Sequence, residues 1–441
     1  MTVARRFSIR YLWVDSLCII QDSKEDWERE SSTMRHVYAN SSCNICATAS
    51  SNPSEGLFRA RQNNIIQPGL MIMKTDSTTN KYYIINNGYW DSQVTRTVLN
   101  KRGWVFQERL LAPRILHFAR HQLFWECFTE NKCEVYPVGI PLHRPLKSFK
   151  PIFTEATQKE GALSMDALCL WHRLIKEYTN CALTRSSDRL AALAGLARLF
   201  QDATGDEYLY GLWRSRLAES MHWQPLSPMT KHSCEYLSPS WSWASGIGSV
   251  TISAPDSHFI TVLDARSHSS SFDITGQLLR GFIKIKGPVV RATCVENVRP
   301  ILVSRRTTSK VYQLRLEVWP PESDDMTHFG SSRQLFIAPP KPSPGLITAA
   351  LFQDFQSTKF DVGRSMLLLG VCVPLFDKVV EPHLKGLILE HTSSSSDLFV
   401  RIGTFEIRGK DRMEEFGVCV NSENKSCWLN EGVKRAVITI V

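Results

Sequence analysis

The sequence has no hydrophobic stretch that approaches the about 18 uncharged residues of a membrane-spanning helix. It also shows no secretory signal, because its first apolar run, Leu12–Ile20, is interrupted by Asp15 and precedes no small-residue cleavage site. Its twelve cysteines form no regular framework. We therefore expect a cytoplasmic protein with reduced thiols and no membrane span.

Signatures of nucleic-acid binding and of metal binding are also missing. The formal net charge is +9, but lysines and arginines are scattered rather than gathered in a stripe, so no nucleic-acid partner is expected. Cys43 and Cys46 form a CxxC without a second ligand pair, and His117 and His121 lack an HExxH context. We interpret all four side chains as structural and predict no metal site and no required cofactor.

What is present begins with an α/β pattern. Leu12–Ile20 is apolar throughout, which is typical of a parallel strand buried on both faces. Ser23 followed by Asp26 matches a capping signature, and the helix after it carries Trp27, Glu30, Met34 and Tyr38 on one face. A second strand is expected within 43–49, a hairpin near 82–85, and a helix at RGWVFQERLL before Pro113.

The remainder of the chain divides by composition. Residues 126–235 contain an irregular linker and then two helical patterns, at 162–180 and 187–200. Residues 236–441 hold short β-type runs separated by Gly, Pro and Ser, which predicts a β-sandwich or a barrel-like region. Trp241 and Trp243 in PSWSWAS alternate with serines, so a strand with both indoles packed in a core is expected.

No P-loop, G-x-S-x-G or dinucleotide fingerprint occurs, so these residues alone indicate no reaction. Two long blocks resemble a known family: LWVDSLCIIQDSKEDWERESSTMRHVYANS (12–41) and RGWVFQERLLAPRILHF (102–118) resemble the fungal heterokaryon incompatibility (HET) domain. Between them, EGLFRAR (55–61) is also similar to that family. Four later stretches resemble the regions that commonly follow a HET domain: LTRSSDRLAALAGLA (183–197), YLYGLW (208–213), PSWSWAS (239–245) and FVRIGTFEI (399–407).

The resemblance implies a fold and a domain division. It places a HET domain at 1–125, an α/β unit with a TIR-like, flavodoxin-like parallel sheet, followed by the helical and β-rich regions. The family's opening block, a strand ending in Ser-Tyr-x-Trp-Gly, has no counterpart in MTVARRFSIRY. We therefore expect an N-terminally incomplete sheet, with an unpaired strand edge.

The resemblance also implies a catalytic hypothesis. HET domains resemble TIR domains distantly, and some TIR domains cleave NAD with a glutamate four residues after a tryptophan. Trp104 and Glu108 have that spacing, so NAD becomes a possible substrate and Glu108 the possible catalytic residue. A carboxylate there would stabilise positive charge on the ribose, and Trp104 would exclude water. The alternative is a plain ion pair of Glu108 with Arg102 or Arg114.

Three other carboxylates are weaker candidates. Glu30 lies on the apolar helix face, where a buried charge needs a partner or a shifted pKa. Asp22 follows the predicted strand, at the end where ligands bind parallel sheets. Asp15 lies within the run, and a structural bond to backbone N–H groups competes with a ligand role.

Taken together, the resemblance implies an effector of fungal non-self recognition that triggers regulated cell death, with NAD cleavage as its mechanism. One alternative is a non-enzymatic module that signals by self-association or through other incompatibility proteins. Another is an inert chain that lacks the opening block.

Overall fold

The computed structural model of the protein describes residues 1–60, 69–75, 78–86, 88–141, 146–153, 161–230, 238–252, 255–267, 281–304, 307–318, 346–361, 363–374, 383–392, 395–421, 426–430, 433 and 435–441. Arg61 of the EGLFRAR stretch lies outside these residues. The chain divides into two compact units: residues 1–148 with 191–196 and 271–277, and residues 149–190 with 197–270 and 278–441. The predicted boundaries at 125 and 235 stay predictions.

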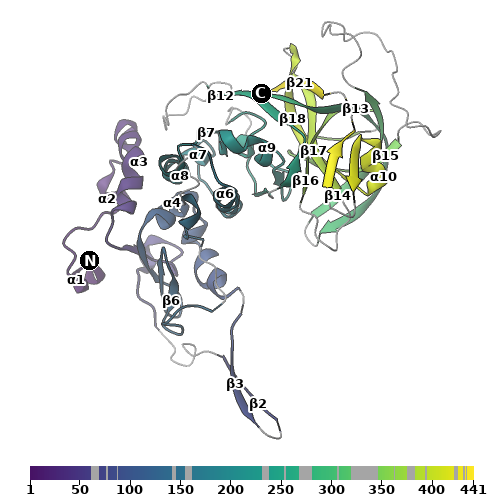
Figure 1. The fold of residues 1–441 in the computed structure, drawn as a ribbon. Coiled ribbons are helices and arrows are strands. Elements are labelled where there is room, and N and C mark those ends of the chain that lie inside the picture. Colours follow the sequence, from purple (N-terminus) through teal and green to yellow (C-terminus); the bar gives the residue numbers. More distant parts are fainter. Residues whose placement is uncertain are drawn as a thin grey trace. The chain divides into compact units, whose positions relative to one another are not determined.

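Unit 1 contains helices, a mixed sheet and a separate hairpin, which Figure 1 draws in purple to blue. Its helical elements are α1 (Thr2–Arg6), α2 (Asp15–Cys18), α3 (Lys24–Ala39), η1 (Pro53–Glu55), η3 (Asp91–Thr95), η4 (Leu99–Lys101) and α4 (Gly103–Leu111). Its strands are β1 (Asn44–Cys46), β2 (Gly69–Lys74), β3 (Thr79–Ile84), β4 (Arg114–Phe118), β5 (Leu123–Cys127) and β6 (Asn131–Cys133).

The four-stranded sheet of unit 1 has the order β1-β4-β5-β6. β1 and β4 are parallel, with Ile45 opposite Leu116, whereas β4–β5 and β5–β6 are antiparallel. The connection that precedes β4 passes through α4, as a parallel crossover requires. Mixed α/β content is therefore confirmed, but among the described residues only one pair of this sheet is parallel.

The prediction of a buried strand at Leu12–Ile20 is wrong. Residues 15–18 form the one-turn helix α2 instead, and the Asp15 carboxylate accepts a hydrogen bond from the Ser16 N–H, 2.7 Å away. Leu17 and Ile20 are 82% and 58% exposed. An apolar run without periodicity does not distinguish a strand from a helical turn, and here the local bond to Asp15 favours the turn.

The two helices predicted in unit 1 are confirmed. Helix α3 begins after Ser23, whose hydroxyl accepts a hydrogen bond from the Asp26 N–H at 3.1 Å. Met34 is buried and Trp27 and Tyr38 are half-buried, so the predicted face packs inward, against α4. Helix α4 ends at Leu111, before Pro113, because proline lacks the N–H that would continue the helix.

Unit 2 contains the helical region and the β-rich region (Figure 1). Its helical elements are η5 (Lys150–Phe153), α6 (Met165–Tyr178), α7 (Asp188–Ala191), α8 (Ala194–Thr204), η6 (Arg214–Arg216), α9 (Leu217–Ser220), η7 (Trp243–Ser245) and α10 (Lys410–Glu415), except that the last residue of α7 and the first three of α8 belong to unit 1. Its strands are β7 (Tyr208–Leu209), β8 (Leu212–Trp213), β9 (Gln224–Pro225), β10 (Val250–Thr251), β11 (Pro255–His258), β12 (Thr261–Arg266), β13 (Phe282–Ser304), β14 (Thr307–Val318), β15 (Leu346–Gln353), β16 (Ser365–Pro374), β17 (His383–Thr392), β18 (Ser395–Arg408), β19 (Val418–Asn421), β20 (Ser426–Leu429) and β21 (Arg435–Ile440).

The β-rich region forms a closed sheet. The strands pair in the order β13-β14-β15-β18-β17-β16, and β16 pairs with β13 again, so six antiparallel strands complete a ring. Alternate side chains fill its interior, among them Leu314, Leu368, Ile388 and Phe405, each fully buried. This closed sheet agrees with the barrel-like region that the sequence predicts.

PSWSWAS packs in the core of unit 2 but is not a strand. Trp241 and Trp243 are both fully buried, which confirms core packing, yet residues 243–245 form a 3-10 turn. The Ser242 hydroxyl caps this turn by accepting a hydrogen bond from the Ala244 N–H and donates one to the carbonyl of Tyr210. The alternation of Ser and Trp therefore reflects capping rather than strand pleating.

One buried arginine links the helical and β-rich regions within unit 2. Arg401 of β18 lies 2.8 Å from the Asp354 carboxylate, and both side chains are fully buried. The same guanidinium donates hydrogen bonds to the carbonyls of Met221 and Trp223. In the described part of the chain, none of the helices combines the length and the hydrophobicity needed to cross a bilayer.

Candidate functional site

Helix α4 presents two consecutive charged side chains in different directions. Arg109 extends to the four-stranded sheet and is buried, whereas Glu108 extends to helix α3 and is half-buried. Successive residues of an α-helix are about 100° apart, which separates the two side chains onto different sides of the helix. The two groups therefore have different surroundings and different roles.

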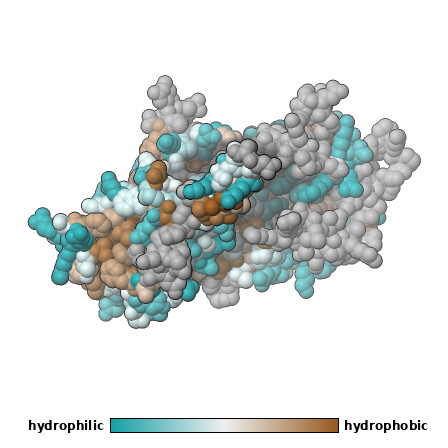
Figure 2. Space-filling view, turned by 90° about the horizontal axis from the view of Figure 1, so that it is seen from below, coloured by the Kyte–Doolittle hydropathy of each residue, from teal (hydrophilic) through white to brown (hydrophobic). Residues whose placement is uncertain are grey.

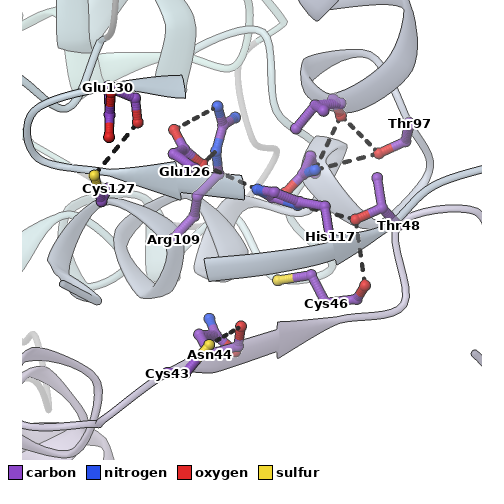
Figure 3. Close-up of polar contacts among 12 residues, drawn as sticks. Cys43, Asn44, Cys46, Thr48, Thr97, Arg109, His117, Glu126, Cys127 and Glu130 are labelled. Carbon is purple, nitrogen blue, oxygen red and sulfur yellow. Dashed lines mark hydrogen bonds and ion pairs between the residues drawn. The ribbon is translucent and has the colours of Figure 1, made fainter. Parts of the chain in front are cut away.

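Arg109 belongs to a buried polar network, which Figure 3 shows between α4 and the sheet. Its guanidinium binds Glu126 of β5 in a bidentate pair, at 2.7 and 2.9 Å. His117 of β4 places Nε2 3.1 Å from the same carboxylate, and its Nδ1 lies 3.0 Å from the Thr48 hydroxyl. The network therefore joins α4 to β4, to β5 and to the loop after β1.

The protonation states within this network follow from its geometry. The Arg109 charge and the His117 hydrogen bond outweigh burial and hold the pKa of Glu126 below its usual range. Burial lowers the pKa of His117, so its ring is neutral near pH 7. Because an ionised carboxylate only accepts, Nε2 carries the proton and Nδ1 accepts from Thr48. All partners are satisfied, which makes this network a rigid support for α4.

Glu108 lies in the opposite situation, because burial outweighs the groups that stabilise its charge. Burial, helped by the negative charge of Asp15, raises the pKa of Glu108 to about 7. A hydrogen bond from the Tyr38 hydroxyl and the charge of Arg102 act in the other direction. Burial and the Glu108 carboxylate together raise the pKa of Tyr38, so the phenol stays protonated and donates. Glu108 is thus ready to exchange its proton near neutral pH.

Aromatic side chains bond to this carboxylate or contact its neighbours. Trp104, one turn before Glu108 on α4, meets Trp27 of α3 edge to face with ring centroids 6.1 Å apart. Trp13 contacts Tyr38 in the same way at 5.6 Å. All of these rings are half-buried, so each retains surface that a ligand can contact. We call Glu108, Tyr38, Trp13, Trp27 and Trp104 the carboxylate site.

The structure brings three of the predicted residues together and leaves two apart. Glu108 and Trp104 belong to the carboxylate site, and exposed Asp15 is close enough for its charge to act on Glu108 and Tyr38. Glu30 is half-buried and binds its neighbour Arg29 at 3.4 Å. Asp22 is exposed and is not among the groups that shift the pKa of Glu108.

Sequence reasoning did not assign functions to Tyr38 and Trp13. Tyr38 lies on the predicted apolar face of α3, but helical periodicity does not indicate that its hydroxyl points to a carboxylate 70 positions later. Trp13 lies in the stretch that was predicted to be a buried strand. The pairing of Arg109 with Glu126 also requires the register of β4 and β5, which the sequence leaves open.

In the part of the chain that the structure describes, no three His, Cys, Asp or Glu side chains are grouped as a metal site would require. Burial raises the pKa of Cys46 to about 12 and also raises that of Cys43, so both thiols stay protonated near pH 7. These cysteines pack at the start of the sheet, as the sequence predicts.

Comparison with known proteins gives one match. The family described as Heterokaryon incompatibility protein (HET) matches residues 1–108, a range that contains every member of the carboxylate site. No curated protein and no solved structure matches the chain.

Proposed function

Residues 1–108 are a heterokaryon incompatibility (HET) domain, and from this premise we propose that the protein is a cytoplasmic effector of fungal non-self recognition. In such non-self recognition, contact between incompatible cells ends in regulated cell death. The domain match supports involvement in heterokaryon incompatibility. The chemistry proposed for it rests on the carboxylate site.

We infer that the carboxylate site cleaves NAD. In this reaction the bond between nicotinamide and the ribose C1′ breaks, and nicotinamide leaves with the electron pair. Water then adds to C1′ and releases one proton. The ribose carries positive charge in the transition state, which an ionised Glu108 would stabilise. The observation that carries this proposal is a half-buried carboxylate with a pKa of about 7 among aromatic rings.

The surroundings of Glu108 suit a planar, cationic substrate. Tryptophan faces attract positively charged rings, and nicotinamide in NAD is such a ring. Trp104 lies one turn before Glu108 on α4 and contacts Trp27, and Trp13 contacts the Tyr38 partner of the carboxylate. The Tyr38 hydrogen bond fixes the carboxylate in one orientation, which is what a pre-organised charge requires.

The test is nicotinamide release from NAD by the purified chain, measured by chromatography. We expect release by the unchanged protein and a loss of at least about a hundredfold in Glu108→Gln, which keeps the shape but not the charge. Glu28→Gln is the matched control, because Glu28 lies on α3 in a surface pair with Lys24 at 3.6 Å. Equal release by Glu108→Gln would remove Glu108 from the mechanism.

A pH profile adds a second readout. Because the ionised form of Glu108 is required, release should rise as pH increases through about 7. Tyr38→Phe removes the hydrogen bond that lowers the pKa of Glu108, so its profile should shift to higher pH. An unshifted profile would contradict the role given to Tyr38.

A non-enzymatic alternative has its own observation in its favour. Large hydrophobic side chains of unit 1 are exposed, for example Tyr11 and Leu17 at 82% each. The view from below in Figure 2 shows hydrophobic residues gathered among hydrophilic ones. Such patches are typical of interaction surfaces, so signalling by self-association or through other incompatibility proteins is the second candidate. Cell death that persists in Glu108→Gln would favour it.

A further inference from the structure

The first turn of α8 belongs to unit 1, although the family match ends at residue 108. Residues 191–196 lie within LTRSSDRLAALAGLA, one of the stretches that resemble the regions after a HET domain. Leu193 and Leu196 are fully buried, and Gly195 before Leu196 is buried as well. This short segment therefore packs as part of the unit that contains the carboxylate site.

Gly195 bonds directly to a side chain of helix α4. Its N–H donates a hydrogen bond to Oε1 of Gln107 at 3.0 Å, and both residues are buried. The first N–H groups of a helix have no acceptors within that helix, so Gln107 caps α8 from another element. Gln107 directly precedes Glu108, so this bond lies one position from the carboxylate of the proposed reaction.

Gly195 also lies where α3 and α4 meet. A Cβ at this position would be 2.8 Å from Gln107 Oε1, 3.0 Å from Leu111 Cδ1 and 3.0 Å from the Cβ of Arg35. Arg35 is on α3, and its Cβ is fixed to the backbone, so an added methyl group would require α3 itself to move. Glycine is therefore the residue that lets α8 approach both helices this closely.

We propose that Gly195 is a positioning residue of the carboxylate site, which holds α3 and α4 at the spacing that brings the Tyr38 hydroxyl to Glu108. Tyr38 comes three residues after Arg35, so the two side chains are neighbours on α3. A change at Gly195 is therefore transmitted over no more than one turn of either helix. The inference rests on the proposed function and adds to it, because a segment outside the family match would then control the site.

The charge of Glu108 depends on how closely Tyr38 approaches it. The Tyr38 hydrogen bond and the charge of Arg102 lower the pKa of Glu108, whereas the charge of Asp15 raises it. Cys46 of β1 also feels the Glu108 charge, but burial keeps its thiol protonated near pH 7. A hydrogen bond weakens more steeply with distance than the charge interactions do. Displacement of α3 should therefore raise the pKa of Glu108.

The test reads the pKa of Glu108 from protein stability and needs no NAD. The free energy of unfolding of the full chain is measured by urea denaturation from about pH 4 to 9, with and without Glu108→Gln. Within such a pair, the difference grows from about pH 4.5 and levels off above the pKa of Glu108 in the folded protein. In Gly195→Ala we expect it to level off about one pH unit higher than in the unchanged chain.

Two further variants make this measurement specific. Gly88→Ala is the matched control, because it adds the same methyl group to unit 1 in ordinary contact with Asn86 Oδ1 at 3.4 Å. Its pair should level off where the unchanged chain does. Gln107→Met removes the acceptor without adding volume at Gly195, should shift the level in the same direction as Gly195→Ala, and gives the same readout if Gly195→Ala does not fold. Equal pKa values of Glu108 in all of these chains would overturn the inference.

The inference and the proposed chemistry fail separately. A higher pKa of Glu108 in Gly195→Ala, without nicotinamide release from the unchanged chain, would refute NAD cleavage and leave the positioning role intact. Nicotinamide release with the same pH profile in Gly195→Ala and in the unchanged chain would refute the positioning role and leave Glu108 in the mechanism.

Discussion

At the scale of single residues, Glu108 makes the fold less stable as pH rises. Its pKa increases from 4.5 to about 7, so the folded state resists ionisation and the unfolded state does not. The stability that depends on protonated Glu108 is complete below pH 4.5 and is lost as pH rises through 7. A residue that costs stability at working pH is typical of a functional site.

The corresponding prediction concerns Glu108→Gln, which cannot ionise. At pH 8 its free energy of unfolding should exceed that of the unchanged protein by about 1–3 kcal/mol, a range reduced for partial exposure. At pH 4 the two should be equal. Urea denaturation at both pH values measures this difference. A variant less stable than the unchanged protein at pH 8 would contradict the assigned pKa.

Glu126 is the structural counterpart of Glu108. Glu126→Gln removes the negative charge that pairs with the buried Arg109 guanidinium, which should cost about 3–5 kcal/mol of unfolding free energy. The control is Glu130→Gln, which disrupts an exposed pair with Lys132 at 2.7 Å and should cost less than about 1 kcal/mol. Similar losses in the two variants, measured by thermal denaturation, would argue against a rigid network.

At the scale of elements, the turn between β7 and β8 depends on Gly211. This residue has φ +94°, and its carbonyl accepts hydrogen bonds from the indoles of Trp171 and Trp243 at 2.9 and 3.0 Å. A Cβ at this position would lie 2.3 Å from the Trp243 ring nitrogen. Both partners are fully buried, so the turn has no room to adjust.

We therefore expect Gly211→Ala to lower the free energy of unfolding by more than about 3 kcal/mol, combining backbone strain with overpacking. Gly363→Ala separates these effects, because Gly363 has φ +86° and no atom within 4 Å of the added Cβ. Its cost should be about 1–2 kcal/mol, from the backbone alone. Equal costs, measured by urea denaturation, would show that the indole contacts matter little.

Local signals in the sequence predicted elements well where side chains bond to nearby backbone. The Ser23 cap fixes the start of α3, and Pro113 fixes the end of α4. The same kind of local bond explains why the strands predicted at Leu12–Ile20 and in PSWSWAS are wrong. Asp15 stabilises a turn inside the apolar stretch, and Ser242 stabilises one inside the alternating stretch. Hydrophobic pattern alone does not include this competition.

The candidate site was predictable only in part, for a similar reason. Glu108 and Trp104 were predicted from a family resemblance. Both lie on the single helix α4, so their spacing along the sequence was enough to place them together. Tyr38 and Trp13 reach the site through packing of α3 against α4 and through the chain before α3, which no local signal encodes. Contacts between residues that are distant in the sequence can be identified only once the fold is known.

At the scale of the whole molecule, one buried arginine links the regions of unit 2. Arg401→Ala removes the guanidinium that pairs with the buried Asp354 carboxylate, together with its bonds to the carbonyls of Met221 and Trp223. We expect a loss of about 3–5 kcal/mol in unfolding free energy. Lys410→Ala, in α10 just after that strand, breaks an exposed pair with Glu414 at 3.8 Å and should cost less than about 1 kcal/mol.

Circular dichroism of these two variants distinguishes the outcomes. If Arg401 links the helical region to the closed sheet, both regions of Arg401→Ala should unfold together on heating. The helical and β-sheet circular dichroism signals should then be lost in one transition, at a lower temperature than in the unchanged protein. Separate transitions in the unchanged protein would contradict a single cooperative unit 2.

The central claim is that Glu108 connects this HET domain to cell death through NAD. The most direct measurement is the NAD content of fungal cells that express the full chain, taken before viability falls. We predict that NAD decreases with the unchanged protein and with Glu28→Gln, but not with Glu108→Gln expressed to the same level. Cell death with undiminished NAD, or an equal decrease with Glu108→Gln, would contradict the account.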